Sequence, residues 1–161
     1  MTKTIVYQGE PGANSHIACE SFDQKLKSVA CGTFDQAFNE IINGSNDFGM
    51  IPIENSIAGR VADIHRLMPT SGLKIIGEFF LEIQHTLMGV KSSDLSSLRT
   101  VRSHEMALSQ CRNSIEKLNL ISHVAADTAG SAREVSELND KTIGAIASPL
   151  AAEIYNLKIL K

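Results

Sequence analysis

The feature that most limits the fold of this chain is a regular alternation of strand-like and helix-like segments along its 161 residues. Short runs rich in β-branched residues, such as TIVYQG at 4–9, are followed by stretches with apolar residues at helical spacing. Strands separated by helices predict mostly parallel sheets that are covered by helices on both faces. The sequence therefore predicts an α/β fold.

Capping residues and helix breakers set the expected element ends. Thr33 and Gly44 suit the start and stop of one helix, and Pro69 is expected to end a helix that begins at Val61. The long β-rich stretch 73–90 is interpreted as two strands with a turn or crossover near 77–82. The expected helices are 14–26, 33–44, 61–68, 104–118, 128–138 and 149–155, and the other expected strands are 28–32, 48–53, 100–103, 121–125, 142–147 and 157–160.

The pattern predicts two similar α/β lobes that are joined at this crossover. No long linker, repeat or low-complexity tract interrupts the chain. We therefore expect residues 1–77 to form the first lobe and residues 78–157 to form the second.

Charge and cysteine usage limit the class of partner. The formal net charge is −3 and no block of like charges occurs, which favours neither nucleic acid nor a membrane surface. The start of the chain has no signal-peptide pattern, and no apolar run approaches the ~20 residues that span a bilayer. Cys19, Cys31 and Cys111 are widely spaced, which favours reduced, mostly buried thiols in a cytoplasmic protein, with a nucleophilic Cys111 as the alternative.

Polar residues follow several predicted strands at their carboxyl ends, where parallel α/β sheets bind ligands. Glu54-Asn55-Ser56 follows the strand at 48–53, and Ser103-His104 follows the strand that begins at Thr100. A helix predicted to begin at Thr128 follows Asp127. Because helix N-termini offer N–H groups and a partial positive potential, we expect a small anionic ligand.

Helix capping is the alternative explanation for some of these residues. Ser103, Asp127 or Thr128 could each be an N-cap alone. Glu54-Asn55-Ser56 has more polar groups than one helix start needs, so a ligand site is favoured there. No residue spacing matches a zinc, calcium, dinucleotide, P-loop or serine-hydrolase motif.

Six segments carry a resemblance to the prephenate dehydratase family that covers essentially the whole chain. They match the family in order and spacing, and several are long and distinctive. The segments are YQGEPGANSHIA, DFGMIPIENSIAGRV, GEFFLEIQHTLMG, VRSHEMALSQC, DTAGSA and GAIASPLAAEIYNLKIL.

The resemblance implies a two-lobed fold like that of type II periplasmic-binding proteins, with the ligand in the cleft between the lobes. It also implies the site residues, position by position. Those implied to be catalytic are Glu54, Asn55 and Ser56, and those implied to bind substrate are Ser103, His104, Gln110, Thr128 and Ala129.

The implied activity is that of a carbon–oxygen lyase of phenylalanine biosynthesis. Such an enzyme converts prephenate, a small-molecule substrate, to phenylpyruvate, water and carbon dioxide, requires no cofactor or metal, and is expected to form a homodimer. Arogenate dehydratase has the same domain and a similar pattern, so arogenate is the alternative substrate. An alternative of another class is a catalytically incomplete module that binds small anions.

Two parts of the family pattern lie outside these 161 residues. In the family, a Thr-Arg-Phe motif with the key catalytic threonine and an ACT domain lie downstream of the segment that LKIL matches. The resemblance therefore implies a dehydratase domain truncated before that motif, with residues 158–161 beginning a segment that returns to the first lobe.

Overall fold

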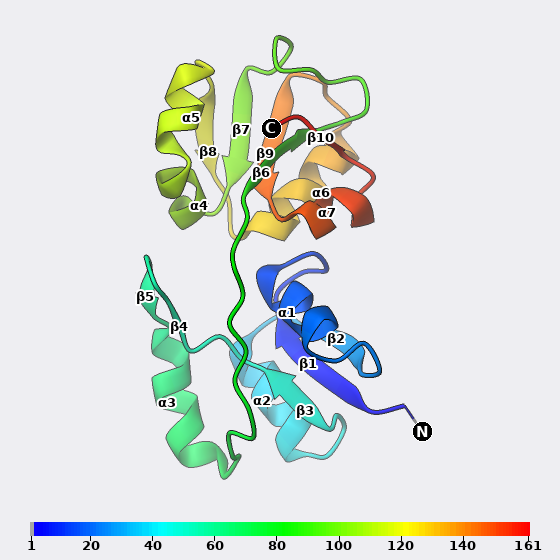
Figure 1. Ribbon diagram of the computed structural model, residues 1–161, viewed down its shortest axis with the longest axis vertical. Helices are drawn as coiled ribbons and strands as arrows, with labels where there is room; N and C mark the ends of the chain where they lie inside the picture. The colour runs from blue at the N-terminus through cyan, green and yellow to red at the C-terminus, as the bar shows by residue number, and fades with distance from the viewer. Residues whose placement is uncertain (1) are drawn as a thin grey trace. The chain divides into compact units, whose positions relative to one another are not determined.

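The computed structural model describes residues 2–161 and divides into two compact units (Figure 1). The first unit comprises the chain up to Glu10 together with Asn14–Glu82, and the second comprises Pro11–Ala13 and Ile83–Lys161. Each unit contains a sheet of mainly parallel strands with helices on both of its faces. The predicted α/β class is therefore confirmed, whereas the likeness to periplasmic-binding proteins stays a prediction.

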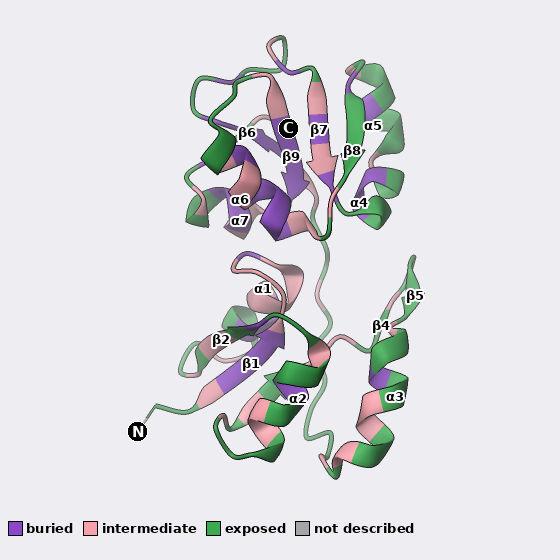
Figure 2. Cartoon of the chain, turned by 180° about the vertical axis from the view of Figure 1, so that it is seen from behind, coloured by how far each residue is buried: buried purple, intermediate pink, exposed green. Residues whose placement is uncertain are grey.

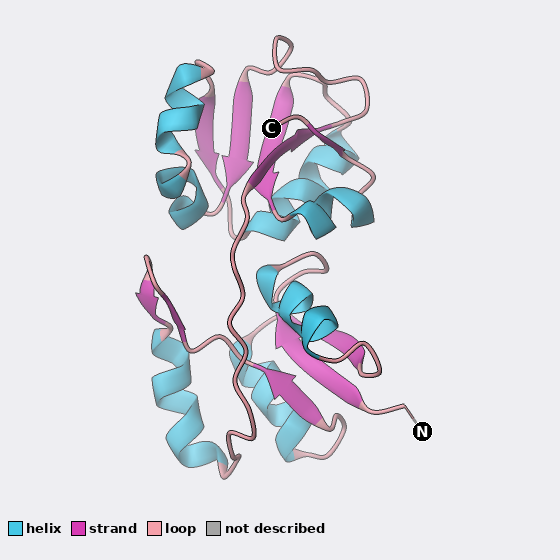
Figure 3. Cartoon of the chain, in the orientation of Figure 1, coloured by secondary structure: helices cyan, strands magenta, loops and turns pink. Residues whose placement is uncertain are grey.

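The first unit is built on a three-stranded parallel sheet. Its elements are β1 (Thr4–Gln8), α1 (Asn14–Phe22), β2 (Lys27–Cys31), α2 (Phe34–Ile42), β3 (Phe48–Met50), β4 (Glu54–Asn55), β5 (Gly59–Arg60) and α3 (Ala62–Ser71). The sheet order is β2-β1-β3, so the first strand lies in the centre (Figure 3). Strand alternation sends Ile5 and Tyr7 toward Cys19 of α1, and Val6 toward Ala37 of α2.

The second unit contains a five-stranded sheet in the order β10-β6-β9-β7-β8. Its elements are β6 (Thr86–Gly89), β7 (Thr100–Ser103), α4 (Glu105–Gln110), α5 (Arg112–Lys117), β8 (Ile121–Val124), α6 (Thr128–Leu138), β9 (Ile143–Ala147), α7 (Pro149–Ile154) and β10 (Lys158–Ile159). Strands β7, β8 and β9 run parallel, and β6 is antiparallel to β9 and β10. Residues 158–161 thus lie in this unit.

Two apolar clusters cover the two faces of this second sheet. Met88 packs with alanines of α6 and α7 on one face, whereas Leu87 and Ile146 pack with α4 and α5 on the other. The central strands and α6 are accordingly the most buried elements (Figure 2). Small residues at 129, 132, 151 and 152 let the two helices of the first cluster approach the sheet closely.

The prediction that Pro69 ends a helix is wrong, because α3 continues to Ser71. Proline removes one backbone donor, but the carbonyl that loses its partner belongs to His65, an exposed residue that water can reach. The hydroxyls of Thr70 and Ser71 donate to carbonyls one turn earlier. The helix then stops at Gly72, whose φ of 70° is the left-handed conformation of a C-cap.

The prediction of two strands within 73–90 is also wrong. Only β6 forms, and residues 73–85 have no regular structure (Figure 3). Ile75, Ile76 and Phe80 are 70, 79 and 84% exposed. High β propensity does not produce a strand without a partner strand, and among residues 2–161 none pairs with this segment.

Several element ends differ from the prediction for local reasons. The helix expected at 104–118 is divided into α4 and α5 at Cys111, where φ is −95° and ψ is 6°. Helix α1 ends at Phe22 because Asp23 accepts a bond from the Lys25 N–H and forms a turn. Strand β3 ends at Met50, two residues before Pro52.

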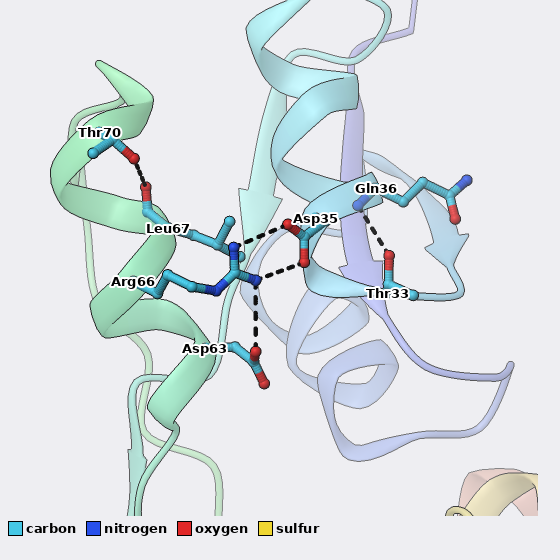
Figure 4. Close-up of polar contacts among 7 residues, drawn as sticks. All are labelled: Thr33, Asp35, Gln36, Asp63, Arg66, Leu67 and Thr70. Atoms are coloured by element: carbon cyan, nitrogen blue, oxygen red, sulfur yellow. Dashed lines mark hydrogen bonds and ion pairs between the residues drawn. The ribbon is translucent and has the colours of Figure 1, made fainter.

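A bidentate ion pair joins α3 to α2 on the surface of the first unit (Figure 4). The Arg66 guanidinium donates to both carboxylate oxygens of Asp35, at 3.2 and 2.8 Å, and also lies 3.7 Å from Asp63. The hydrogen bond from Arg66 is the main cause that lowers the pKa of Asp35, and charge attraction adds to it.

We predict that Arg66→Ala lowers the melting temperature slightly at neutral pH but not in acid. The pKa of Asp35 is lower in the folded state, so its stabilisation is present above the ordinary carboxyl pKa of about 3.9 and is lost as the pH falls through the folded-state value. The effect is small because the pair is exposed. Thermal unfolding across this pH range, with Asp35→Asn as the matched variant, tests it; an equal loss at every pH would contradict the pair as cause.

The segment Pro11–Ala13 belongs to the second unit although the chain before and after it belongs to the first. The Ser148 hydroxyl donates to the Gly12 carbonyl at 2.5 Å, and the Tyr155 hydroxyl donates to the Pro11 carbonyl at 2.9 Å. Gly12 has φ 90°, and a Cβ there would lie 2.7 Å from the Cα of Ala151. Glycine is therefore required both by the backbone conformation and by the space.

Candidate functional site

The predicted catalytic residues lie in a β-hairpin of the first unit rather than at the entry to a helix. Strands β4 and β5 pair antiparallel, with Glu54 opposite Arg60 and Asn55 opposite Gly59. The Asn55 Oδ1 accepts the N–H groups of Ile57 and Ala58, each at 2.9 Å. Asparagine side chains often close turns in this way, so Asn55 fixes the hairpin tip.

This hairpin presents its polar groups to solvent. Glu54 and Ser56 are exposed and Asn55 is half-buried. Since the turn occupies the Asn55 carbonyl oxygen, the group that remains for a ligand is its NH₂, which has no hydrogen-bond partner among residues 2–161. Asn55 is therefore held as a donor of hydrogen bonds.

In the second unit, four chain segments meet at one edge of the sheet. Ser103 at the end of β7 pairs with Val124 at the end of β8, and β9 ends beside them at Ala147. Strand β6 is antiparallel, so its first residue, Thr86, pairs with Ala147 at this same edge. We call this the carboxyl edge of the second sheet.

Ser103 is placed at this edge but its hydroxyl is used by the fold. It is completely buried, and its Oγ donates to the Ile146 carbonyl at 2.6 Å. Binding a carboxylate would require that bond to break. Ser103 therefore has weak structural support for contact with a ligand.

His104 is exposed and is the N-cap of α4. Its Nδ1 accepts the Met106 N–H at 3.2 Å. In neutral histidine the other ring nitrogen then carries the proton, which makes Nε2–H a donor. Like Asn55, this side chain uses its acceptor within the fold and retains a donor.

Gln110 lies at the end of α4 and also retains a donor. Its Oε1 accepts a hydrogen bond from Nε2 of His85, at 3.1 Å. His85 directly precedes β6, so the contact connects Gln110 to the carboxyl edge of the second sheet. His85 is not among the residues predicted from the sequence, because nothing in its local pattern indicates a contact with Gln110.

Thr128 and Ala129 form the first turn of α6. Asp127 is the N-cap, and its carboxylate accepts the Gly130 N–H at 2.6 Å. A Cβ at Gly130 would lie 2.7 Å from that carboxylate, so glycine makes room for the cap. The N–H groups of Thr128 and Ala129 have no intrahelical acceptors at this position. Ala129 is completely buried, so the N–H group of half-buried Thr128 is the one better placed for an anion.

The alternative role for Cys111 has no support in the structure. Burial raises the pKa of the Cys111 thiol, and it raises that of Cys19 to about 12. A thiol with a raised pKa is a poor nucleophile near neutral pH. The described residues also contain no group of three His, Cys, Asp or Glu side chains that could hold a metal ion.

A cavity of about 300 Å³ in the first unit is separate from these residues. It lies between the starts of β1 and β3 and the segment 76–79, and none of the predicted site residues lines it.

No helix among the described residues is long and apolar enough to cross a membrane.

Three predicted site residues thus share one property. Asn55, His104 and Gln110 each give their acceptor atom to a contact within the protein and keep an N–H donor. A set of neutral donors suits an anionic ligand, and it would bind a cation poorly. The geometry within each unit therefore favours an anion.

Known proteins resemble the chain over nearly its whole length. The sequence profile of a family described as prephenate dehydratase matches residues 5–161. A bifunctional N-acyl-homoserine lactone acylase/prephenate dehydratase of Komagataeibacter europaeus is 41% identical over 99% of this chain and 57% of its own length. The chloroplastic arogenate dehydratase/prephenate dehydratase 2 of Arabidopsis thaliana is 36% identical over 97% of this chain and 41% of its own length.

A solved structure agrees with these relatives. The crystal structure of a prephenate dehydratase from Arthrobacter aurescens, in complex with L-Phe, is 26% identical, with a TM-score of 0.90 over 98% of this chain and 54% of that chain. The chain thus spans about half the length of these proteins.

Proposed function

Because the chain belongs to the prephenate dehydratase family, we propose that it converts prephenate to phenylpyruvate, water and carbon dioxide in phenylalanine biosynthesis. The observation that carries the proposal is the donor-only character of Asn55, His104 and Gln110. Prephenate carries two carboxylates and so needs donors rather than acceptors. Arogenate, which carries an ammonium group as well, is the alternative substrate and is suggested by the Arabidopsis relative.

The chemistry requires a hydroxide to leave while the ring carboxylate departs as carbon dioxide. We propose that Asn55 and Ser56 hold the substrate by hydrogen bonds, and that Glu54 orients it or protonates the leaving oxygen, as a placed acid contributes ~10²–10⁴-fold. His104, Gln110 and the N–H group of Thr128 would bind a carboxylate. Neutral donors suit a carboxylate that must become neutral CO₂, because a tight ion pair would favour the ground state.

We also propose that the enzyme works in the cytoplasm, on a small-molecule substrate, as a homodimer. Three free thiols agree with a cytoplasmic, reducing compartment. The substrate is a small molecule, and assembly as a homodimer follows from the family resemblance.

We predict that the protein forms phenylpyruvate from prephenate. Product formation should be measured with prephenate and with arogenate, beside calorimetric titration of prephenate and phenylpyruvate. Faster turnover of prephenate supports the proposal, and turnover of arogenate alone assigns the alternative substrate. Binding without any product would instead support the non-catalytic anion-binding module.

A second candidate activity comes from the name of the Komagataeibacter relative, which includes an N-acyl-homoserine lactone acylase. Its 41% identity over 99% of this chain justifies one additional assay with an N-acyl-homoserine lactone. Release of a fatty acid, followed by mass spectrometry, would assign that activity to this chain.

A further inference from the structure

We propose that His85 is a positioning residue that holds the Gln110 amide with its NH₂ group available to the substrate. The inference rests on the proposed function, in which Gln110 donates to a carboxylate. The family resemblance did not imply a role for His85. Nε2 of His85 lies 3.1 Å from Oε1 of Gln110.

The chemistry of that contact allows only one direction of donation. A carbonyl oxygen of an amide can only accept, so the His85 Nε2 must carry the proton. In neutral His85 the ring is then the Nε2–H tautomer. The Gln110 carbonyl oxygen is occupied, and its NH₂ is the end of the amide that remains.

The backbone around His85 is firmly held at the carboxyl edge of the second sheet. Thr86, the next residue, pairs with Ala147, and its hydroxyl donates to the Ala147 carbonyl at 3.0 Å. Leu87 is buried and bonds through its backbone to Lys161. His85 itself is half-buried. The imidazole is therefore attached to the residue that directly precedes a hydrogen-bonded strand.

Gln110 needs such a partner because its own surroundings do not fix it. It is exposed and is the last residue of a six-residue helix that breaks at Cys111. The two ends of an exposed primary amide have similar shapes and can exchange by rotation. An amide with its oxygen forward would repel a carboxylate, so the His85 contact selects the productive orientation.

The fold also occupies the acceptor atoms of the other two donor residues, Asn55 and His104. The Asn55 oxygen is occupied by two backbone N–H groups, and the His104 Nδ1 by one. In each case a backbone N–H group occupies the acceptor atom of the side chain, so that atom is not available to a ligand. His85 does for Gln110, through a side chain, what the backbone does for Asn55 and His104.

A double-mutant cycle tests whether His85 acts through Gln110. We expect His85→Ala to raise KM for prephenate about tenfold with a smaller change in kcat, as lost orientation of a binding donor predicts. The double variant His85→Ala/Gln110→Ala should match Gln110→Ala alone within about twofold, because both remove one unit. His85→Gln, which keeps an N–H donor, should recover most of the loss, and His65→Ala on exposed α3 is the control. Fully additive effects would overturn the proposal.

A second measurement is independent of turnover. Nitrogen chemical shifts of the His85 ring should show the Nε2–H tautomer in the wild type, with a changed Nε2 signal in Gln110→Ala. The Nδ1–H tautomer, or a signal indifferent to Gln110, would overturn the positioning role whether or not the protein is a dehydratase. Absence of turnover with the expected tautomer would reject the proposed function and, with it, the role toward prephenate, while supporting the contact between His85 and Gln110.

Discussion

Replacing Asn55 with aspartate is expected to lower kcat/KM for prephenate by about 10²–10³-fold, the loss typical of a missing oxyanion donor. The aspartate oxygen can still accept the N–H groups of Ile57 and Ala58, so the hairpin should keep its shape. The NH₂ donor is lost and a negative charge takes its place near a dianionic substrate. Steady-state kinetics of both proteins measure the effect.

A matched variant separates the turn from the donor. Asn55→Ala removes both the turn bonds and the NH₂, so slower turnover should be accompanied by faster hydrogen exchange at Ile57 and Ala58. In Asn55→Asp, the exchange of these two amides should match that of the wild type. An Asn55→Asp protein with an unchanged rate would show that the Asn55 amide does not contact the substrate.

Replacing Gly12 with alanine is expected to destabilise the protein by about 3 kcal/mol, because a conformational cost of about 1–2 kcal/mol coincides with a packing cost of about 1–3 kcal/mol. The φ of 90° strains any residue with a Cβ, and that Cβ would lie 2.7 Å from the Ala151 Cα and 2.9 Å from its Cβ. Because the closest atoms include the backbone Cα and N of Ala151, the clash cannot be relieved by rotating a flexible side chain. Urea unfolding, analysed through the midpoint and the m-value, measures the change.

Gly72 provides the control, since its φ is 70° but no atom lies within 4 Å of an added Cβ. Gly72→Ala should therefore show the conformational cost alone, about 1–2 kcal/mol. Equal losses in the two variants would mean that the contact between Gly12 and α7 adds nothing to stability.

Elements with clear local signals could be predicted from the sequence. The helix expected at 128–138 is confirmed at Thr128–Leu138, where Asp127 caps the start and Asn139 adopts the left-handed conformation at the end. The N-cap at Thr33 is confirmed by its bond from the Gln36 N–H, at 3.1 Å. Errors arose where partners decide the outcome, since residues 73–85 have strand-like composition but no described strand beside them.

The sequence indicated the residues of the candidate site but not which of their atoms are free. Residue types and strand ends led to Glu54-Asn55-Ser56, Ser103 and His104, but not to the atoms that remain for a ligand. A tertiary contact decides this for Ser103, whose hydroxyl donates to the Ile146 carbonyl, whereas a local turn decides it for Asn55. Contacts such as Ser103–Ile146 and His85–Gln110 join residues far apart in the chain, and local patterns do not contain them.

The position of Pro11–Ala13 in the second unit also bears on the order of folding. Its two side-chain bonds, to Ser148 and Tyr155, span 136 and 144 residues. During synthesis on a ribosome, this early segment must wait until α7 has emerged before it can dock. Since closing long loops is slow, the second unit completes its structure late, and residues 83–161 produced alone would lack three residues of their own unit.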